Sequence, residues 1–154
     1  MHRSFMPGLM VAAGLAALLA STPVAAQFAK PEDAIRYRKA GMTMMNAHLG
    51  RVAAMASGRA PFDAKAVADN VEIATLLSKL PYAGFIEGTD KGDTKADPKI
   101  WTEMDKFRAA AAKMQDEMAK LNAAAKTGNI DAIKSAVGAT GQACKACHDS
   151  YRKE

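Results

Sequence analysis

The sequence predicts an all-α protein, an antiparallel up-down-up-down four-helix bundle. Apolar residues recur every three or four positions in four separate segments, which is the spacing of one face of a helix. No segment shows the alternation typical of strands, and no internal repeat is visible. A chain of 154 residues can bury one substantial core. Four amphipathic helices in a chain of this size pack most simply as a bundle.

Residues 1–26 have the pattern of a secretory signal peptide. Basic Arg3 precedes an uninterrupted small and apolar run, Leu9 to Ala20, and small residues stand before Gln27. We expect cleavage after Ala26, which makes residues 27–154 the mature domain in a periplasmic location. A retained membrane anchor is the alternative, although the apolar run is short for a membrane span and Pro23 follows it.

The first two helices follow from their start signals and apolar positions. Pro31, with two acidic residues behind it, begins a helix that runs to about Ala56. Asp63 is the expected N-cap of the second helix, which ends before Pro81. The inward face of the second helix is predicted to comprise Val67, Val71, Ala74, Leu77 and Leu80.

A long crossover loop, residues 81–97, precedes the third helix; loops of this length in a compact domain often lie over a functional site. The third helix is expected to run unbroken from Pro98 to about Ala125, with Gly128 closing it. Asn129 then caps the fourth helix. Its predicted inward stripe is Ile130, Ile133, Val137, Gly141, Cys144, His148 and Tyr151.

Composition excludes several classes of protein. The charged fraction of 24% beside a hydrophobic fraction of 49% is unlike a disordered chain, and two cysteines cannot make a disulfide framework. The 21 basic residues are interleaved with 16 acidic ones, so the net charge of +5 favours solubility rather than nucleic-acid binding. No nucleophile with a base partner, phosphate loop or carboxylate pair appears, and we expect no enzymatic activity.

The chemistry is concentrated in the segment from Cys144 to His148, which reads Cys-Lys-Ala-Cys-His. Two thiols three residues apart on a helix can add to the two vinyl groups of one haem, and the adjacent imidazole can bind the iron. A covalent link also suits an exported protein, because the cofactor cannot be lost to the surroundings. The motif therefore predicts one covalently bound haem c.

Three other interpretations of the motif compete with this one. A redox-active dithiol belongs at the start of a helix, where the helix dipole lowers the thiol pKa, and these cysteines lie near a helix end. A zinc site needs four ligands, and His48 is the only other histidine of the mature chain. A disulfide within one helical turn would close almost no loop. A helical bundle without haem is the remaining alternative.

The chain resembles the class II c-type cytochromes, cytochrome c′ in particular. The resemblance covers residues 27–154 and is carried by the segment from Gln27 to Ala34, the pair Tyr37-Arg38, and the final run from Cys144 to Lys153. It implies a haem held inside the bundle, with His148 as the axial ligand. Met42 occupies the family's distal position, and it could also be an ordinary core residue.

The resemblance implies two possible functions, which depend on Met42. If its thioether stays unbonded, the iron is five-coordinate and high-spin, and the protein binds nitric oxide or carbon monoxide while retaining a capacity for electron transfer. If Met42 ligates, the iron is six-coordinate and low-spin, and the protein is a dedicated electron carrier with a periplasmic redox partner. We favour the five-coordinate form because the likeness is to cytochrome c′.

Further haem contacts are expected at the edge of the site. Arg38, one turn before Met42, could reach a haem propionate or be a solvated surface residue; Lys39 lies beside it. Arg152 is expected near the proximal face, and Asp93 of the crossover loop near the haem edge, unless it simply forms a turn. Aromatic residues that could pack near the ring, or equally in the ordinary core, are Tyr82, Phe85 and Trp101. His48 lies too far along its helix to compete for the iron.

The resemblance also implies a homodimer. The second apolar flank of the first helix offers a candidate association surface, comprising Ala34, Tyr37, Gly41 and Met44. We expect no membrane partner once the signal peptide is removed.

Overall fold

The computed structural model describes residues 27–153, which form a bundle of four long helices. The predicted signal peptide lies outside the described residues. The helices are α1 (Pro31–Ala56), α2 (Ala64–Leu77), α4 (Met104–Thr127) and α5 (Ile130–Tyr151), with the 3₁₀ turn η2 (Pro81–Gly84) and the short helix α3 (Lys99–Thr102) between α2 and α4. The described part contains no strand, only an isolated bridge between Ala96 and Arg152. The predicted fold class is confirmed.

The capping signals act as predicted. The carboxylate of Asp63 accepts a hydrogen bond from the backbone N–H of Ala66 at 3.0 Å at the start of α2. The Asn129 side chain accepts from the N–H groups of Asp131 and Ala132 at the start of α5. Gly128, at φ 67°, ends α4 in the left-handed conformation that glycine adopts without strain. These local contacts account for the agreement between prediction and structure at the starts of α2 and α5 and at the end of α4.

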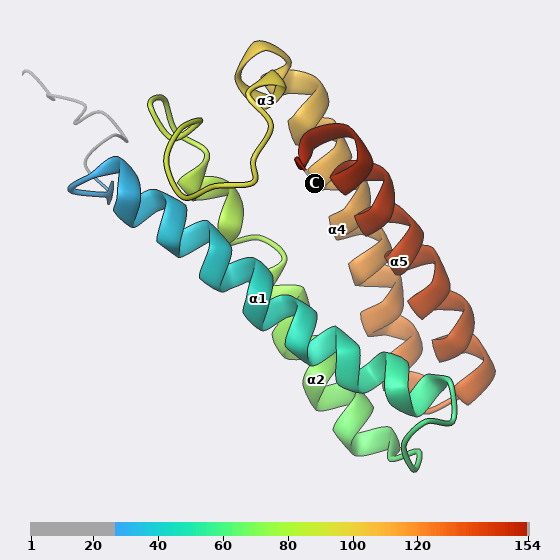
Figure 1. Ribbon diagram of the computed structural model, residues 1–154. Helices are drawn as coiled ribbons and strands as arrows, with labels where there is room; N and C mark the ends of the chain where they lie inside the picture. Colours follow the sequence, from blue (N-terminus) through green and yellow to red (C-terminus); the bar gives the residue numbers. More distant parts are fainter. Residues whose placement is uncertain (1–26, 154) are drawn as a thin grey trace, which may run out of the picture.

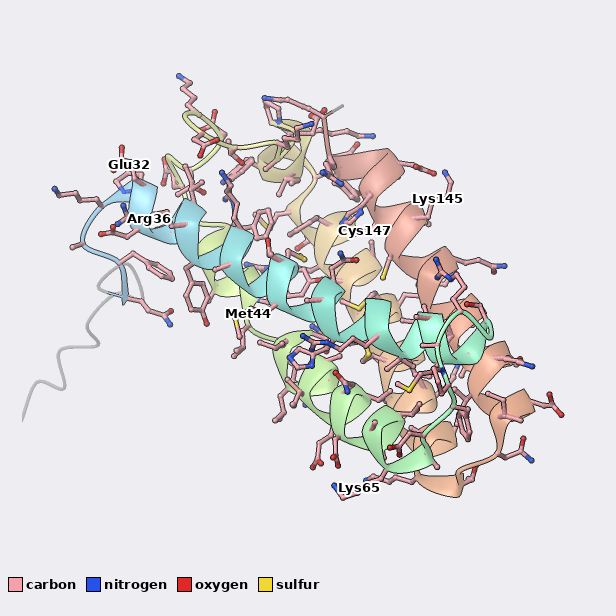
Figure 2. The ribbon with its side chains drawn as sticks, turned by 60° about the horizontal axis from the view of Figure 1, so that its bottom comes forward. Glu32, Arg36, Met44, Lys65, Lys145 and Cys147 are labelled. Atoms are coloured by element: carbon pink, nitrogen blue, oxygen red, sulfur yellow. The ribbon has the colours of Figure 1, made fainter. Side chains whose placement is uncertain are left out.

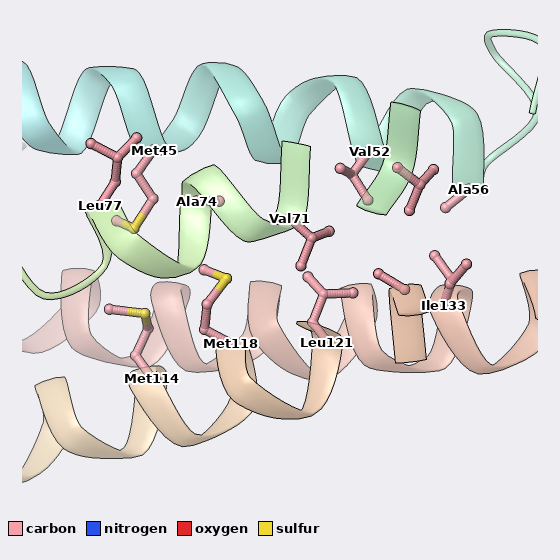
Figure 3. Packing of buried hydrophobic residues seen from close by; sticks show 12 residues of the cluster. Met45, Val52, Ala56, Val71, Ala74, Leu77, Met114, Met118, Leu121 and Ile133 are labelled. Carbon is pink, nitrogen blue, oxygen red and sulfur yellow. The ribbon is translucent and has the colours of Figure 1, made fainter. Parts of the chain in front are cut away.

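The main core lies between the helix pairs. Twelve buried residues from all four long helices pack together, among them Val52, Val71, Met118 and Ile133, which are fully enclosed (Figure 3). Figure 1 shows α1 and α5 close together near the end of α1 and diverging toward the C-terminal end of α5. The fully enclosed core residues Val52 and Ile133 lie toward the end of α1 and the start of α5.

Two predictions about the helices are wrong. The third helix is broken at Glu103, where φ −126° and ψ 38° leave the helical range, so α3 and α4 are separate. The break accompanies packing of Ile100 against Phe107 and Tyr151 in a second small core. The predicted inward faces also each include one residue that is exposed. Leu80 is exposed because α2 already ends at Leu77, and Gly141 is exposed on α5.

The predicted association surface is wrong at two positions. Ala34 is fully buried, and Gly84 of η2 lies so close to its carbonyl oxygen that no side chain would fit between them. Gly41 faces the ring of Pro81. The flank of α1 that carries both residues is therefore covered by η2, whereas Met44 remains exposed.

Candidate functional site

A cavity of about 650 Å³ lies between α1 and α5. The turn η2, the crossover segment (residues 85–98) and α4 contribute the other walls. Eight site residues predicted from the sequence line this cavity: Arg38, Lys39, Met42, Asp93, Cys144, Cys147, His148 and Arg152. Residues separated by up to 114 positions in the chain, from Arg38 to Arg152, are thus brought to one place.

Helix α5 presents both thiols and the imidazole on its cavity side. Cys144, Cys147 and His148 are one helical turn or less apart, and all three line the cavity. Figure 2 shows Cys147 on the side of α5 toward α1 and Lys145 on the outer side. The i, i+3 spacing of the cysteines is therefore realised as a pair of sulfur atoms facing the same space.

The electrostatics of the motif do not suit a redox-active dithiol. Burial raises the pKa of the Cys144 thiol, and burial together with Cys144 raises that of Cys147. A reactive dithiol needs a lowered thiol pKa. Burial lowers the pKa of His148, the positive charge of Arg152 lowers it further, and Asp149 acts in the opposite direction. The neutral imidazole, which is the form that binds a metal, is thereby favoured.

A metal site built from protein ligands alone has no support in the described part of the chain. Between residues 27 and 153, no three His, Cys, Asp or Glu side chains gather as a metal site. His48, the spare histidine, is not a cavity residue: its Nδ1 lies 2.9 Å from Oδ1 of Asn70 between α1 and α2. The competing zinc interpretation is therefore unsupported.

The cavity wall opposite α5 combines three apolar side chains with the polar residues Arg38, Lys39, Thr43 and Asn46. Met42, Met45 and Leu49 line it from α1, and their spacing places them on one helical face. Tyr82, Phe85, Phe107 and Met114 also line the cavity. Two thiols, one imidazole and broad apolar walls suit a flat hydrophobic ring that is attached at one side and ligated at its centre. The residues present thus fit a haem.

Comparison with known proteins agrees with this geometry. The family described as Cytochrome C' matches residues 33–152. The chain belongs to the cytochrome c′ family. It is 52% identical over 129 residues to cytochrome c′ of Rubrivivax gelatinosus, covering 83% of this chain and 100% of the relative. It is 45% identical over 128 residues to cytochrome c′ of Alcaligenes xylosoxydans xylosoxydans, covering 83% and 99%.

Solved structures of the family share the fold. A crystal structure of cytochrome c′ from Rubrivivax gelatinosus matches with a TM-score of 0.80 at 52% identity and covers 82% of this chain and 100% of that one. A nitric oxide complex of a cytochrome c prime variant from Alcaligenes xylosoxidans matches with a TM-score of 0.79 at 44% identity, covering 83% and 99%. Like the family, this chain binds haem c.

Arg38 is not the solvated surface residue that the sequence left open. Only 3% of it is exposed, and it lies in the cavity wall. Its two terminal nitrogens donate hydrogen bonds to Gly84, Thr89 and Thr94 of η2 and the crossover segment. A direct contact with a haem propionate stays a prediction.

The remaining predicted contacts lie at the cavity mouth. Lys39 Nζ donates to the Asp93 carboxylate at 2.6 Å, and both side chains are well exposed, so the pair adds little stability. Arg152 belongs to the isolated bridge with Ala96, which joins the crossover segment to the end of α5. Haem contacts of Lys39, Asp93 and Arg152 stay predictions.

Several cavity residues were not singled out from the sequence. Met45, Leu49 and Met114 line the cavity, yet in the sequence they are ordinary core positions of amphipathic helices. Met45 and Leu49 could have been predicted as cavity residues, because their spacing places them on the same helical face as Met42. Of the three aromatic candidates, Tyr82 and Phe85 line the cavity, whereas Trp101 packs on Phe85 with 6.3 Å between ring centroids and is not a lining residue.

Proposed function

We propose that this cytochrome c′ family member holds a five-coordinate, high-spin haem iron, binds nitric oxide and carbon monoxide, and can transfer electrons, rather than acting as an enzyme. Bound haem supplies an iron that can change oxidation state and hold a gas molecule. Cys144 and Cys147 would hold the ring through thioethers, and the imidazole of His148 would bind the iron. Met42, which lines the cavity from α1, would stay unbonded to the iron.

The apolar stripe Met42, Met45 and Leu49 on the cavity side of α1 is the observation that carries the proposal. These three side chains offer no hydrogen-bond donor to an anion and no strong partner to water, so they favour a small neutral ligand such as a diatomic gas. Polar Thr43 and Asn46 line the cavity beside them. Two solved structures of variants of the related protein from Alcaligenes xylosoxidans are nitric oxide complexes. This supports gas binding as the function of the same cavity here.

The six-coordinate alternative also rests on Met42. Its thioether and the imidazole of His148 line one cavity from opposite helices, so a His/Met ligand pair is chemically available. An iron held in that way would favour electron transfer and resist added ligands. The two functions therefore differ in a single bond.

Optical spectroscopy of the reduced full-length protein separates them. We expect a broad high-spin Soret band that shifts on addition of carbon monoxide. Sharp low-spin bands that are indifferent to carbon monoxide would rule out the five-coordinate proposal and support the electron carrier. In the Met42→Ala variant we expect carbon monoxide to associate about five- to tenfold faster, because moving a covering side chain out of its rotamer costs about 1 kcal/mol.

Met44→Ala is the matched control. Met44 is on the same helix, but its side chain is exposed and does not line the cavity. We expect its carbon monoxide kinetics to equal those of the wild type. Equal acceleration in both variants would mean that α1 as a whole, and not Met42, limits entry.

We also propose export to the periplasm and assembly as a homodimer. No helix within residues 27–153 is long and apolar enough to cross a membrane. The exposed side chains Met44, Ile73, Leu76 and Leu80 of α1, α2 and the turn after α2 give an apolar surface for association. N-terminal sequencing of the periplasmic fraction should begin at Gln27, and sedimentation equilibrium should give twice the subunit mass; a cytoplasmic full-length monomer would contradict both.

A further inference from the structure

The guanidinium of Arg38 makes an unusually complete set of hydrogen bonds. Nη1 donates to the carbonyl oxygen of Gly84 at 2.9 Å and to Oγ1 of Thr89 at 2.8 Å. Nη2 donates to the carbonyl oxygen of Thr89 at 2.7 Å and to Oγ1 of Thr94 at 2.8 Å. Each terminal nitrogen carries two N–H groups. All four terminal donors are thus occupied, and only Nε–H remains.

Aromatic rings complete the enclosure of Arg38. Its central carbon lies 4.4 Å from the ring centroid of Phe85 and 5.5 Å from that of Trp101. Trp101 Nε1 in turn donates to the carbonyl oxygen of Ile86 at 2.9 Å. Arg38 therefore fastens the first half of the crossover segment to α1 through both polar and aromatic contacts.

No acidic side chain of the described residues pairs with Arg38. All its acceptors are neutral oxygens, and the nearest predicted acid of the site, Asp93, pairs with Lys39 instead. Burial alone lowers the pKa of Arg38 to about 10, which still leaves it charged at neutral pH. The positive charge of Arg38 thus stands in the wall of the haem cavity without a carboxylate partner from the described part of the protein.

We propose that Arg38 is a positioning residue with two separable effects: it clamps the crossover segment along one edge of the haem cavity, and it places a positive charge that has no protein counterion beside the haem. This goes beyond gas binding and does not depend on the coordination number of the iron. The clamp holds the α1 side of the segment. The bridge between Ala96 and Arg152, with Lys153 N–H donating to the Lys95 carbonyl at 2.8 Å, holds the α5 side.

Both effects bear on the haem. Asp93, Thr94 and Lys95 of the crossover segment line the cavity, so releasing the segment would open that edge to water. A positive charge in a wall of low polarity favours the reduced iron, which carries one more electron, and so raises the reduction potential. Clamp geometry and charge can be removed independently.

The test uses three variants of the full-length haem protein at pH 6. Arg38→Met removes clamp and charge, Arg38→Lys keeps the charge but loses the fork of donors, and Thr94→Val keeps the charge and removes one acceptor. Hydrogen exchange of residues 85–96 reports the clamp. The midpoint reduction potential reports the charge.

We expect amide exchange in residues 85–96 to be about tenfold or more faster in all three variants. The midpoint potential should fall in Arg38→Met and stay near the wild-type value in Arg38→Lys and Thr94→Val. Arg36→Met is the matched control: Arg36 is exposed on the same helix and pairs with Asp33, so neither readout should change.

Two results would overturn the proposal. If amide hydrogen exchange of residues 85–96 were unchanged in Arg38→Lys and Thr94→Val, Arg38 would not clamp the crossover segment. This conclusion would hold even if Arg38→Met failed to fold. Equal drops in potential for Arg38→Lys and Arg38→Met would show that the potential follows the position of the segment and not the charge.

Discussion

The contact between α1 and η2 is tight enough for one methyl group to disturb it, and Gly84→Ala tests this directly. A Cβ atom at Gly84 would lie 2.5 Å from the carbonyl oxygen of Ala34 and 3.0 Å from Cβ of Arg38. Gly84 is not among the glycines with positive φ, so alanine suits the backbone and the conflict is purely steric. Either η2 or α1 must move.

The expected destabilisation follows from two contributions. Overpacking against a backbone atom costs about 1–3 kcal/mol. The same shift weakens the hydrogen bond from Arg38 to the Gly84 carbonyl, and bonds from charged donors contribute about 1.5–3 kcal/mol. Replacing glycine also restricts the unfolded chain, which offsets about 0.4–1 kcal/mol. We expect a net loss of about 3 kcal/mol in the free energy of unfolding, or about 10 °C in melting temperature.

Urea denaturation of the haem protein, followed by circular dichroism, measures this loss. Gly138→Ala is the control, because Gly138 lies within α5 and has nothing within 4 Å of the position of a Cβ. Alanine there should stabilise the protein by about 0.5–1 kcal/mol. A Gly84→Ala midpoint within experimental error of the wild type would refute the close packing of η2 on α1.

Two further predictions concern stability away from the cavity. Leu121→Ala should lower the free energy of unfolding by about 2–5 kcal/mol in urea melts, because Leu121 is fully buried in the main core. Lys134→Ala, at an exposed position of α5 outside the proposed association surface, should change it by less than about 0.5 kcal/mol. Similar values for both would contradict the assigned core. Asn129→Ala should lower thermal stability by about 1 kcal/mol because the N–H groups of Asp131 and Ala132 lose their acceptor, whereas Asn129→Gly should lose only a few tenths. Equal loss in both variants would argue against the side-chain cap.

The order of the four long helices and the attachment motif could be predicted from the sequence. Proline at the start of α1, the caps Asp63 and Asn129, and the left-handed Gly128 act on neighbouring residues, so their effect does not depend on the rest of the fold. The same holds for Cys144 and Cys147, whose common face follows from helical geometry alone.

Other features depended on which segments pack together. The helical spacing of apolar residues in the sequence does not show that η2 covers Ala34, or that a break at Glu103 separates α3 from α4. It also does not show whether an amphipathic position such as Met45 faces the core or the cavity, since both are apolar.

Arg38 shows most clearly what the sequence determines and what only tertiary packing determines. From the sequence it was a basic residue one turn before Met42, expected at a haem propionate, with a solvated surface residue as the alternative. Its partners are 46, 51 and 56 positions away in the chain, and they meet it only after η2 and the crossover segment fold onto α1. By itself, the sequence determined the helices, their caps and the haem-attachment motif, because these depend on residues within a few turns of one another. Tertiary packing alone decided the burial of Arg38 and the walls of the cavity, because those depend on contacts between distant segments.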